Sequence, residues 1–304
     1  MIAPDLGALE ADVGRALATR DASRLCLVGH GEISLVLGWP PDDPCVACKR
    51  LPPFHDMDAF REYRDVVDRY MGALHRGGVP LVDTEVHHVR RRDGRVVGFH
   101  VQPLLPADAL ATEVLRRTTP SPDHPLLAQV TDTVVRATTD RVGIDAQLSN
   151  WMWLEGRAWQ LDLTTPFLLD ERGRPELDLA PFLAALPALV RPVVRREMRT
   201  LIRRWATARG ALLDLAANLL KEELDPWLTP ALEVVNERVE PPITAAEAAR
   251  VHADDRRLWP LLFRLERANR WWQRRVRHRS FEFLLPERTT YEEHEMVTGT
   301  RRRR

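Results

Sequence analysis

Four polar residues have the types and spacing that nucleotide chemistry requires. They are a lysine that ends the apolar run Val46-Ala47-Cys48, an aspartate and an asparagine five positions apart, and a second aspartate twelve positions further on: Lys49, Asp145, Asn150 and Asp162. A site for a nucleoside triphosphate and magnesium needs a fixed cation, a carboxylate near the attacking hydroxyl, and oxygen ligands for the metal. The sequence therefore predicts such a site if the fold brings these four side chains together. The alternative for Asp145 and Asn150 is an Asx turn inside a buried polar network.

Composition indicates a folded protein of one large domain or two lobes that share a core. The chain has 304 residues, 44% of them hydrophobic and 29% charged, with a formal net charge of zero. Residues 1–20 contain Asp5, Glu10 and Asp12, which is not typical of a signal peptide, and no apolar run approaches the roughly 18 residues of a membrane span. We therefore expect a cytoplasmic protein without a transmembrane segment.

Three cysteines suit a reducing compartment and argue against a disulfide framework. Cys45 and Cys48 form a C-x-x-C pair, but residues three apart on a strand point to opposite faces. We expect them to pack rather than to hold a metal.

The first hundred residues read mainly as strands with an amphipathic helix between them. Residues 58–75 carry apolar side chains at spacings of three and four, which predicts the helix, and Asp93-Gly94 is a strong hairpin turn signal. A further short helix is expected over residues 1–19. The expected strands are residues 25–39, with a glycine interruption, and residues 44–51, 82–91 and 95–105.

The rest of the chain reads as mostly helical, apart from a small hairpin that turns at Glu155-Gly156. Helical periodicity covers residues 126–142, 180–209, 212–224, 245–254 and 258–279.

Four motifs occur in the order typical of a known superfamily. The segment from Gly29 to Val36 resembles the G-x-G-x-x-G-x-V loop, with Ser34 in place of the third glycine, and Val46-Ala47-Cys48-Lys49 resembles V-A-I-K. Asp145 and Asn150 match the D-x-x-x-x-N interval of a catalytic loop, and Asp162 follows where a metal-binding aspartate should lie. Over residues 25–190 the chain thus resembles the protein-kinase-like superfamily, most closely its aminoglycoside-phosphotransferase-like small-molecule kinases. It also resembles an uncharacterised actinobacterial kinase-like family.

The resemblance implies an α+β, bilobal protein-kinase-like fold. Residues 1–103 would form a small N-lobe with five strands and one helix. Residues 104–304 would form a large, mostly helical C-lobe with a C-terminal helical extension.

The resemblance also implies ATP and Mg²⁺ as cofactors, and it assigns roles to residues of the N-lobe. Gly29, Gly31 and Ser34 would cover the phosphates. Lys49 would bind the α and β phosphates.

Glu62, on the helix that follows the lysine strand, would orient Lys49. Its alternative is a solvated helix face. Gln102 and Leu104 would lie near the adenine, although Pro103 between them lacks an amide donor.

In the C-lobe, the resemblance implies that Asp145 handles the proton of the substrate hydroxyl, and that Asn150 and Asp162 hold magnesium. The expected activity is transfer of the γ-phosphoryl group of ATP to a hydroxyl of a small molecule or peptide. The residues beside two of these positions depart from the family pattern: Gly143 and Ile144 before Asp145, and Leu163 and Thr164 after Asp162. They favour the alternative of a catalytically inactive scaffold that binds nucleotide or a partner protein.

Positive charge is concentrated toward the C-terminus. From Arg191 onward the chain has 24 Arg and Lys against 17 Asp and Glu, a local net charge of +7. The arginines of residues 264–279 form a basic stripe that could contact RNA, lipid headgroups or a phosphorylated substrate, and residues 301–304 add a basic tail. A solvated helix face is the simpler interpretation, so nucleic acid is not the expected partner.

Overall fold

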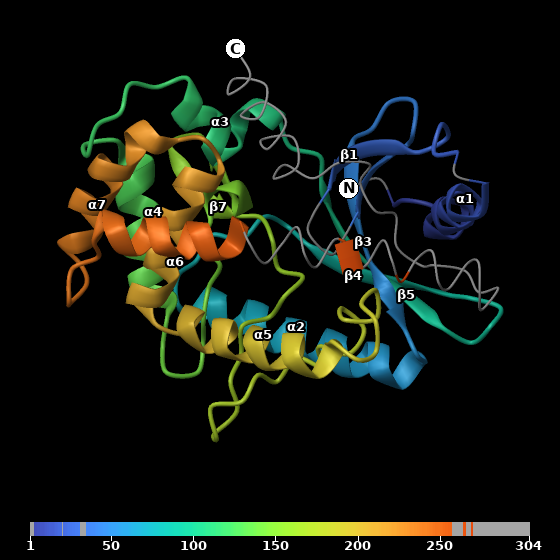
Figure 1. The fold of residues 1–304 in the computed structure, drawn as a ribbon. Helices are drawn as coiled ribbons and strands as arrows, with labels where there is room; N and C mark the ends of the chain where they lie inside the picture. The colour runs from blue at the N-terminus through green and yellow to red at the C-terminus, as the bar shows by residue number, and fades with distance from the viewer. Residues whose placement is uncertain (1–2, 20, 31–34, 257–263, 266–268, 270–304) are drawn as a thin grey trace, which may run out of the picture.

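The computed structural model describes residues 3–19, 21–30, 35–256, 264–265 and 269, and it shows an α+β protein (Figure 1). A five-stranded antiparallel sheet has the strand order β1-β2-β3-β5-β4. Its strands are β1 (Cys26–His30), β2 (Leu35–Trp39), β3 (Val46–Phe54), β4 (Glu85–Arg90) and β5 (Val96–Pro103). The expected strands are thus confirmed, with the Asp93-Gly94 turn between β4 and β5.

Side chains alternate in direction along β3 and β5, so one face of the sheet is apolar and the other carries polar residues. One face carries Val46, Cys48, Phe99 and Val101, which pack in an apolar cluster with helix α1 (Leu6–Thr19). Side chains on a strand alternate between the two faces, so Lys49, His100 and Gln102 belong to the other face. Lys49 and His100 are direct cross-strand partners.

Helix α2 (Met57–Arg76) contributes the apolar stripe that residues 58–75 predicted. Phe60 of this stripe packs on Leu51 and closely approaches Gly98, where a larger residue would collide with its ring. The sheet therefore packs with two helices, α1 and α2, rather than with the single helix expected for a small lobe.

The remaining described elements are mostly helical. They include the small hairpin β6 (Trp151–Leu154) and β7 (Arg157–Gln160), whose turn residues Glu155 and Gly156 have φ of 51° and 76°. The helices are α3 (Ala111–Arg116), α4 (Pro125–Ala137), α5 (Arg191–Trp205), α6 (Ala208–Lys221) and α7 (Leu228–Asn236), followed by a helix over residues 245–256. Short 3-10 helices are η1 (Ala107–Ala109), η2 (Leu148–Asn150) and η3 (Asp225–Trp227).

Two predicted helices were too long. The helix expected from residue 180 begins at Arg191, because prolines at positions 181 and 187 disfavour helical backbone before them, whereas Pro192 suits a first turn. The helix expected to reach residue 142 ends at Ala137, where the Thr139 hydroxyl accepts hydrogen bonds from the next backbone amides and forms a local turn instead. The helix expected over residues 258–279 lies almost wholly outside the described residues.

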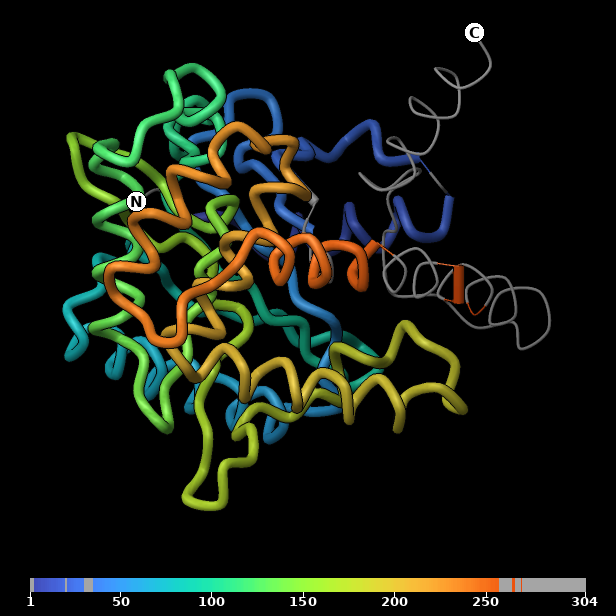
Figure 2. Tube along the Cα trace, turned by 60° about the vertical axis from the view of Figure 1, so that its left-hand side comes forward, coloured from blue at the N-terminus to red at the C-terminus, as the bar shows by residue number. Residues whose placement is uncertain are grey.

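A second, larger apolar cluster runs from the sheet into the helices. It contains Leu51 and Phe54 of β3, the buried stripe of α2, and side chains of α4, α6 and α7. Helix α6 is buried over most of its length, and α5 lies on the same side of the molecule as α2 (Figures 1 and 2). The segments that carry the candidate site are therefore anchored in one shared core.

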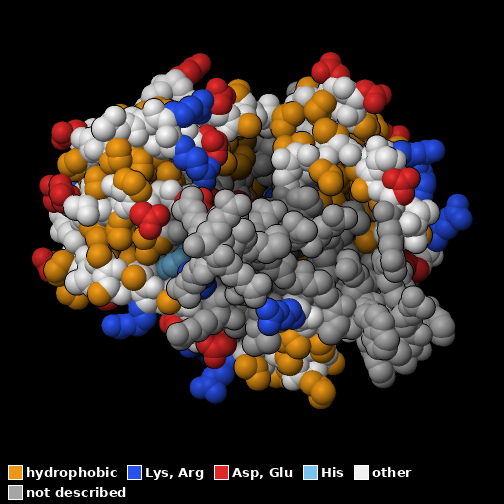
Figure 3. Space-filling view, turned by 45° about the horizontal axis from the view of Figure 1, so that its top comes forward, with side chains coloured by type: hydrophobic (Ala, Val, Ile, Leu, Met, Phe, Trp, Pro, Cys, Tyr) orange, Lys and Arg blue, Asp and Glu red, His pale blue; other side chains and the backbone are white. Residues whose placement is uncertain are grey.

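No described helix combines the length and the apolar composition needed to cross a membrane. On the described part of the face shown in Figure 3, hydrophobic, acidic and basic side chains are interspersed.

Candidate functional site

Lys49 and Asp162 form an ion pair between β3 and the segment that follows β7. The Lys49 Nζ lies 2.6 Å from the Asp162 Oδ2, and the side chains are 15% and 25% exposed. Two of the residues predicted to act on phosphate and metal thus meet directly, although they lie far apart in the sequence.

Asp162 is held in its ionised form by its neighbours. Burial by itself raises the pKa of this carboxyl. The charge and hydrogen bond of Lys49, together with hydrogen bonds from the Thr164 amide and hydroxyl to Oδ1, more than offset burial and lower the pKa to about 2. The carboxylate is therefore negative at neutral pH and able to bind a cation.

Asp145 and Asn150 form the second pair. The Asn150 Nδ2 donates to the Asp145 Oδ2 at 2.7 Å, and the Gln147 amide donates to Oδ1 at 2.9 Å. The indole of Trp151 donates to the Asp145 carbonyl oxygen at 3.2 Å. This geometry contains the Asx turn weighed as an alternative, and it also holds the Asp145 carboxylate in one orientation.

The hairpin β6–β7 brings the two pairs together. Its ladder pairs Trp151 with Gln160, and one step further the Leu161 amide donates to the Asn150 carbonyl oxygen at 2.8 Å. Asn150 and Asp162 therefore emerge from the same end of this hairpin. The pKa of Tyr70 also shows that Asp145 and Asp162 lie near each other. Burial raises this pKa well above the usual range, and the negative charges of both aspartates raise it further.

A buried polar network lies behind the ion pair. The Tyr63 hydroxyl donates to the Thr164 carbonyl oxygen at 3.0 Å, so its contact with His100 at 2.8 Å requires the His100 Nε2 to carry the proton and donate. Burial lowers the pKa of His100 to about 3, with a smaller contribution from Lys49, and Asp162 opposes the shift. A neutral histidine thus connects β5 to α2 and to the segment after Asp162.

Neither Tyr63 nor His100 was among the site residues that the sequence predicted. The signal for Tyr63 was nonetheless present, because Tyr63 belongs to the apolar stripe of α2.

The expected pairing of Lys49 with Glu62 is not made. Glu62 lies on the exposed side of α2, because the apolar stripe that includes Phe60 and Tyr63 turns toward the sheet. The partner of Lys49 is Asp162, and the position on α2 that faces the site belongs to Tyr63.

The donors expected near the adenine are engaged within the protein. The Gln102 Nε2 donates to the Leu161 carbonyl oxygen at 2.7 Å and to the Thr84 hydroxyl at 2.9 Å. The Leu104 amide donates to the Cys45 carbonyl oxygen at 3.0 Å, which extends the β3–β5 ladder by one step. These two donors therefore do not provide the expected adenine contacts in this structure.

Of the residues expected to cover the phosphates, Gly29 lies in β1 opposite Val36 of β2. Gly31 and Ser34 lie outside the described residues. Lys49, which is also paired with Val36, shares this end of the sheet with Gly29.

The oxygen atoms of Asn150 and Asp162 fit magnesium. Within the described ranges, no group of three or more His, Cys, Asp or Glu could hold a metal, but Mg²⁺ commonly takes one or two protein oxygens and completes its shell with phosphate and water. The Asn150 amide nitrogen is engaged with Asp145, which leaves its Oδ1 without a hydrogen-bond partner among the described residues. Asp162 and Asn150 can thus serve together with a nucleotide, not as a closed metal site.

Residues 8–270 match the family of unknown function DUF6206, so the chain belongs to that family. The match includes all four residues of the two pairs. No curated protein matches the chain.

Proposed function

We propose that the protein is a phosphotransferase of protein-kinase-like type that uses ATP and Mg²⁺ to phosphorylate a hydroxyl of a small molecule or peptide. The observation that carries the proposal is the ion pair of Lys49 with Asp162 beside the pair of Asp145 with Asn150. The cation Lys49 lies on β3, and the amide of Asn150 ends η2. The carboxylates lie just outside these elements, Asp145 before η2 and Asp162 after β7.

Three of these residues would bind the nucleotide and its metal ion. Lys49 would bind the phosphates of ATP and exchange its contact with Asp162 for one with phosphate oxygens. Asn150 and Asp162 would hold Mg²⁺, which supplies neutralisation of the charge on the β and γ phosphates. The ion pair keeps Asp162 ionised before nucleotide arrives.

Transfer breaks the bond between the γ phosphorus and the β–γ bridging oxygen and forms a bond to the acceptor oxygen. The acceptor's proton passes to Asp145, and ADP leaves. Asn150 and the Gln147 amide hold the Asp145 carboxylate in one orientation, which is the positioning such a reaction requires.

The test is ADP formation with a panel of hydroxyl acceptors, with Asp145→Asn as the matched control. We expect a thermal shift with Mg-ATP in both proteins and ADP release above background in the native protein only. Equal rates in the two proteins across the panel would contradict the proposal.

A second candidate is an inactive scaffold of the same fold. It is favoured by the exposed position of Glu62 and by the internal hydrogen bonds of Gln102 and Leu104. This candidate predicts a thermal shift with nucleotide, or with a partner protein, and no acceptor-dependent ADP release.

A further inference from the structure

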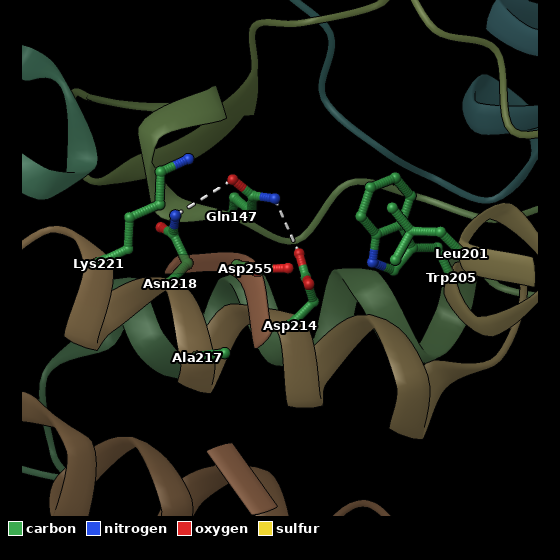
Figure 4. A pocket seen from close by; sticks show the side chains of 8 residues that line it. All are labelled: Gln147, Leu201, Trp205, Asp214, Ala217, Asn218, Lys221 and Asp255. Carbon is green, nitrogen blue, oxygen red and sulfur yellow. Dashed lines mark hydrogen bonds between the residues drawn. The ribbon is translucent and has the colours of Figure 1, made fainter. Parts of the chain in front are cut away.

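Helix α5 has two faces of different character. Its inner face carries Leu201, Ile202 and Trp205, which pack in the larger apolar cluster. Leu201 and Trp205 also line a pocket together with Asp214 of α6 (Figure 4). On this side an arginine of α5 finds an anionic partner, since Arg204 lies 3.3 Å from the Asp214 carboxylate.

The outer face of α5 is basic. Four exposed side chains follow one another at spacings of three and four, which places them on one side of the helix: Val193, Arg196, Thr200 and Arg203. Arg199 is exposed as well, three positions from Arg196 and four from Arg203. Three arginines therefore lie next to one another on this face.

The positive charge of the outer face is not compensated by the protein. Among the described residues, Arg196 and Arg199 make no side-chain hydrogen bond or ion pair, and Arg203 donates to the Gly173 carbonyl oxygen at 2.7 Å. Glu197 is the single acidic residue of α5, and no residue three or four positions from it is an arginine. Like charges at helical spacing destabilise an isolated helix, so an anionic partner would relieve this repulsion.

Two exposed apolar side chains lie at the N-terminal end of the outer face. Leu189 is 93% exposed and Val193 is 63% exposed, and the described residues include only two other exposed large hydrophobic side chains. Leu189 lies in the turn before α5, where the Arg191 guanidinium donates to the Leu186 carbonyl oxygen at 2.9 Å. The turn therefore presents Leu189 to the solvent in a fixed position.

An anionic lipid surface matches both features of this face. Basic side chains are attracted by the negative potential of the headgroups, and apolar side chains can enter the boundary between headgroups and acyl chains. A nucleic acid would use the arginines alone, because none of the exposed side chains of α5 is aromatic and could stack on a base. The apolar end of the face therefore favours lipid.

We propose that the outer face of α5, with Leu189 at its end, binds the surface of a membrane that contains anionic lipids. The three arginines would contact the headgroups, and Leu189 and Val193 would enter the interface. The protein would lie on the membrane without spanning it. This contact does not depend on the proposed phosphotransferase function.

The test is sedimentation of the full chain with vesicles of phosphatidylcholine, either alone or with about one third phosphatidylserine. We expect binding to the mixed vesicles only, weakened by added salt. Arg196→Gln/Arg199→Gln should weaken this binding about 30-fold, because two attractions to the headgroups are lost. Leu189→Ser should weaken it about tenfold, because the side chain that enters the interface is removed.

The matched control is Arg61→Gln/Arg64→Gln, which removes the same charge from exposed positions of α2. It should bind the mixed vesicles as the native protein does. Thermal unfolding should show that all the variants are folded.

Equal binding to neutral and mixed vesicles, or no binding to either, overturns the proposal. Binding to mixed vesicles that both α5 variants retain also overturns it, because the basic residues beyond position 256 would then account for the contact. Polyuridylate or polyglutamate might be bound more tightly than the mixed vesicles, with the binding lost in Arg196→Gln/Arg199→Gln and kept in Leu189→Ser. That result overturns the lipid surface and assigns the face to a soluble polyanion.

Discussion

Lys49 and Arg50 are neighbours on β3, yet their side chains enter two different ion pairs on opposite faces of the sheet. Arg50 contacts Glu10 of α1 at 2.7 Å, and the two side chains are 5% and 6% exposed. Lys49 contacts Asp162 at 2.6 Å, with 15% and 25% exposed. The same chemistry is therefore closed to solvent on one face and partly open on the other.

The two ion pairs differ in how the charge of the carboxylate is compensated. Glu10 accepts hydrogen bonds from both Arg50 and Arg91, so its charge is compensated by the fold itself. Among the residues that the structure describes, Asp162 has one cationic partner, and it lies beside the Asn150 end of the β6–β7 hairpin. Only the second pair can exchange a partner for a ligand without opening the core.

The largest expected effect is on activity. Lys49→Met should lower phosphoryl transfer by about 1,000-fold, because it removes a fixed charge from the developing phosphate charge. The fold should remain, since the site is partly open and methionine has a similar length. ADP release and thermal unfolding on the same samples measure both effects. A loss of less than tenfold in activity would place Lys49 outside the reaction.

The next effect is on stability. Arg50→Met should lower the free energy of unfolding by about 3 kcal/mol, because it leaves part of the Glu10 charge buried with a single cation. Urea unfolding measures this loss. Arg61→Met is the matched control, since the Arg61 side chain is 61% exposed and should matter little. Equal losses in the two variants would remove the distinction between the faces of the sheet.

The smallest expected effect is a pH dependence on the Lys49 face. His100 has a pKa of about 3 in the fold and 6.5 as a free side chain, so its contribution to stability is complete above pH 6.5 and is lost as the pH falls toward 3. Between pH 6.5 and 5 the native protein should lose about 2 kcal/mol from this group. Urea unfolding at several pH values should show that His100→Gln lacks this slope.

His87→Gln is the control for the pH experiment, because His87 lies on the neighbouring strand β4 and its side chain is 44% exposed. It should keep the native slope. An unchanged slope in His100→Gln would mean that His100 is not the buried neutral group that the Tyr63 network requires.

Local patterns predicted most of the secondary structure. The Asp93-Gly94 and Glu155-Gly156 turns and the apolar stripe of α2 were correct because each depends on residues close in the chain. The helix expected from residue 180 failed at its start, since apolar spacing alone did not account for the prolines there.

The candidate site was predicted in part. Spacing selected the residues of the two pairs, and the helical register of α2 contained the information that Glu62 is exposed and Tyr63 is buried.

That Lys49 and Arg50 point to opposite faces follows from their adjacent positions on one strand, because side chains alternate along any strand. The contact of Asp145 with Asn150 is also local, since the two residues are five positions apart. The pairing of Arg50 with Glu10 and of Lys49 with Asp162, in contrast, depends on how distant segments pack. Each of those pairs joins segments distant in the sequence. Such segments meet only when α1 packs in one apolar cluster and the β6–β7 hairpin packs in the other.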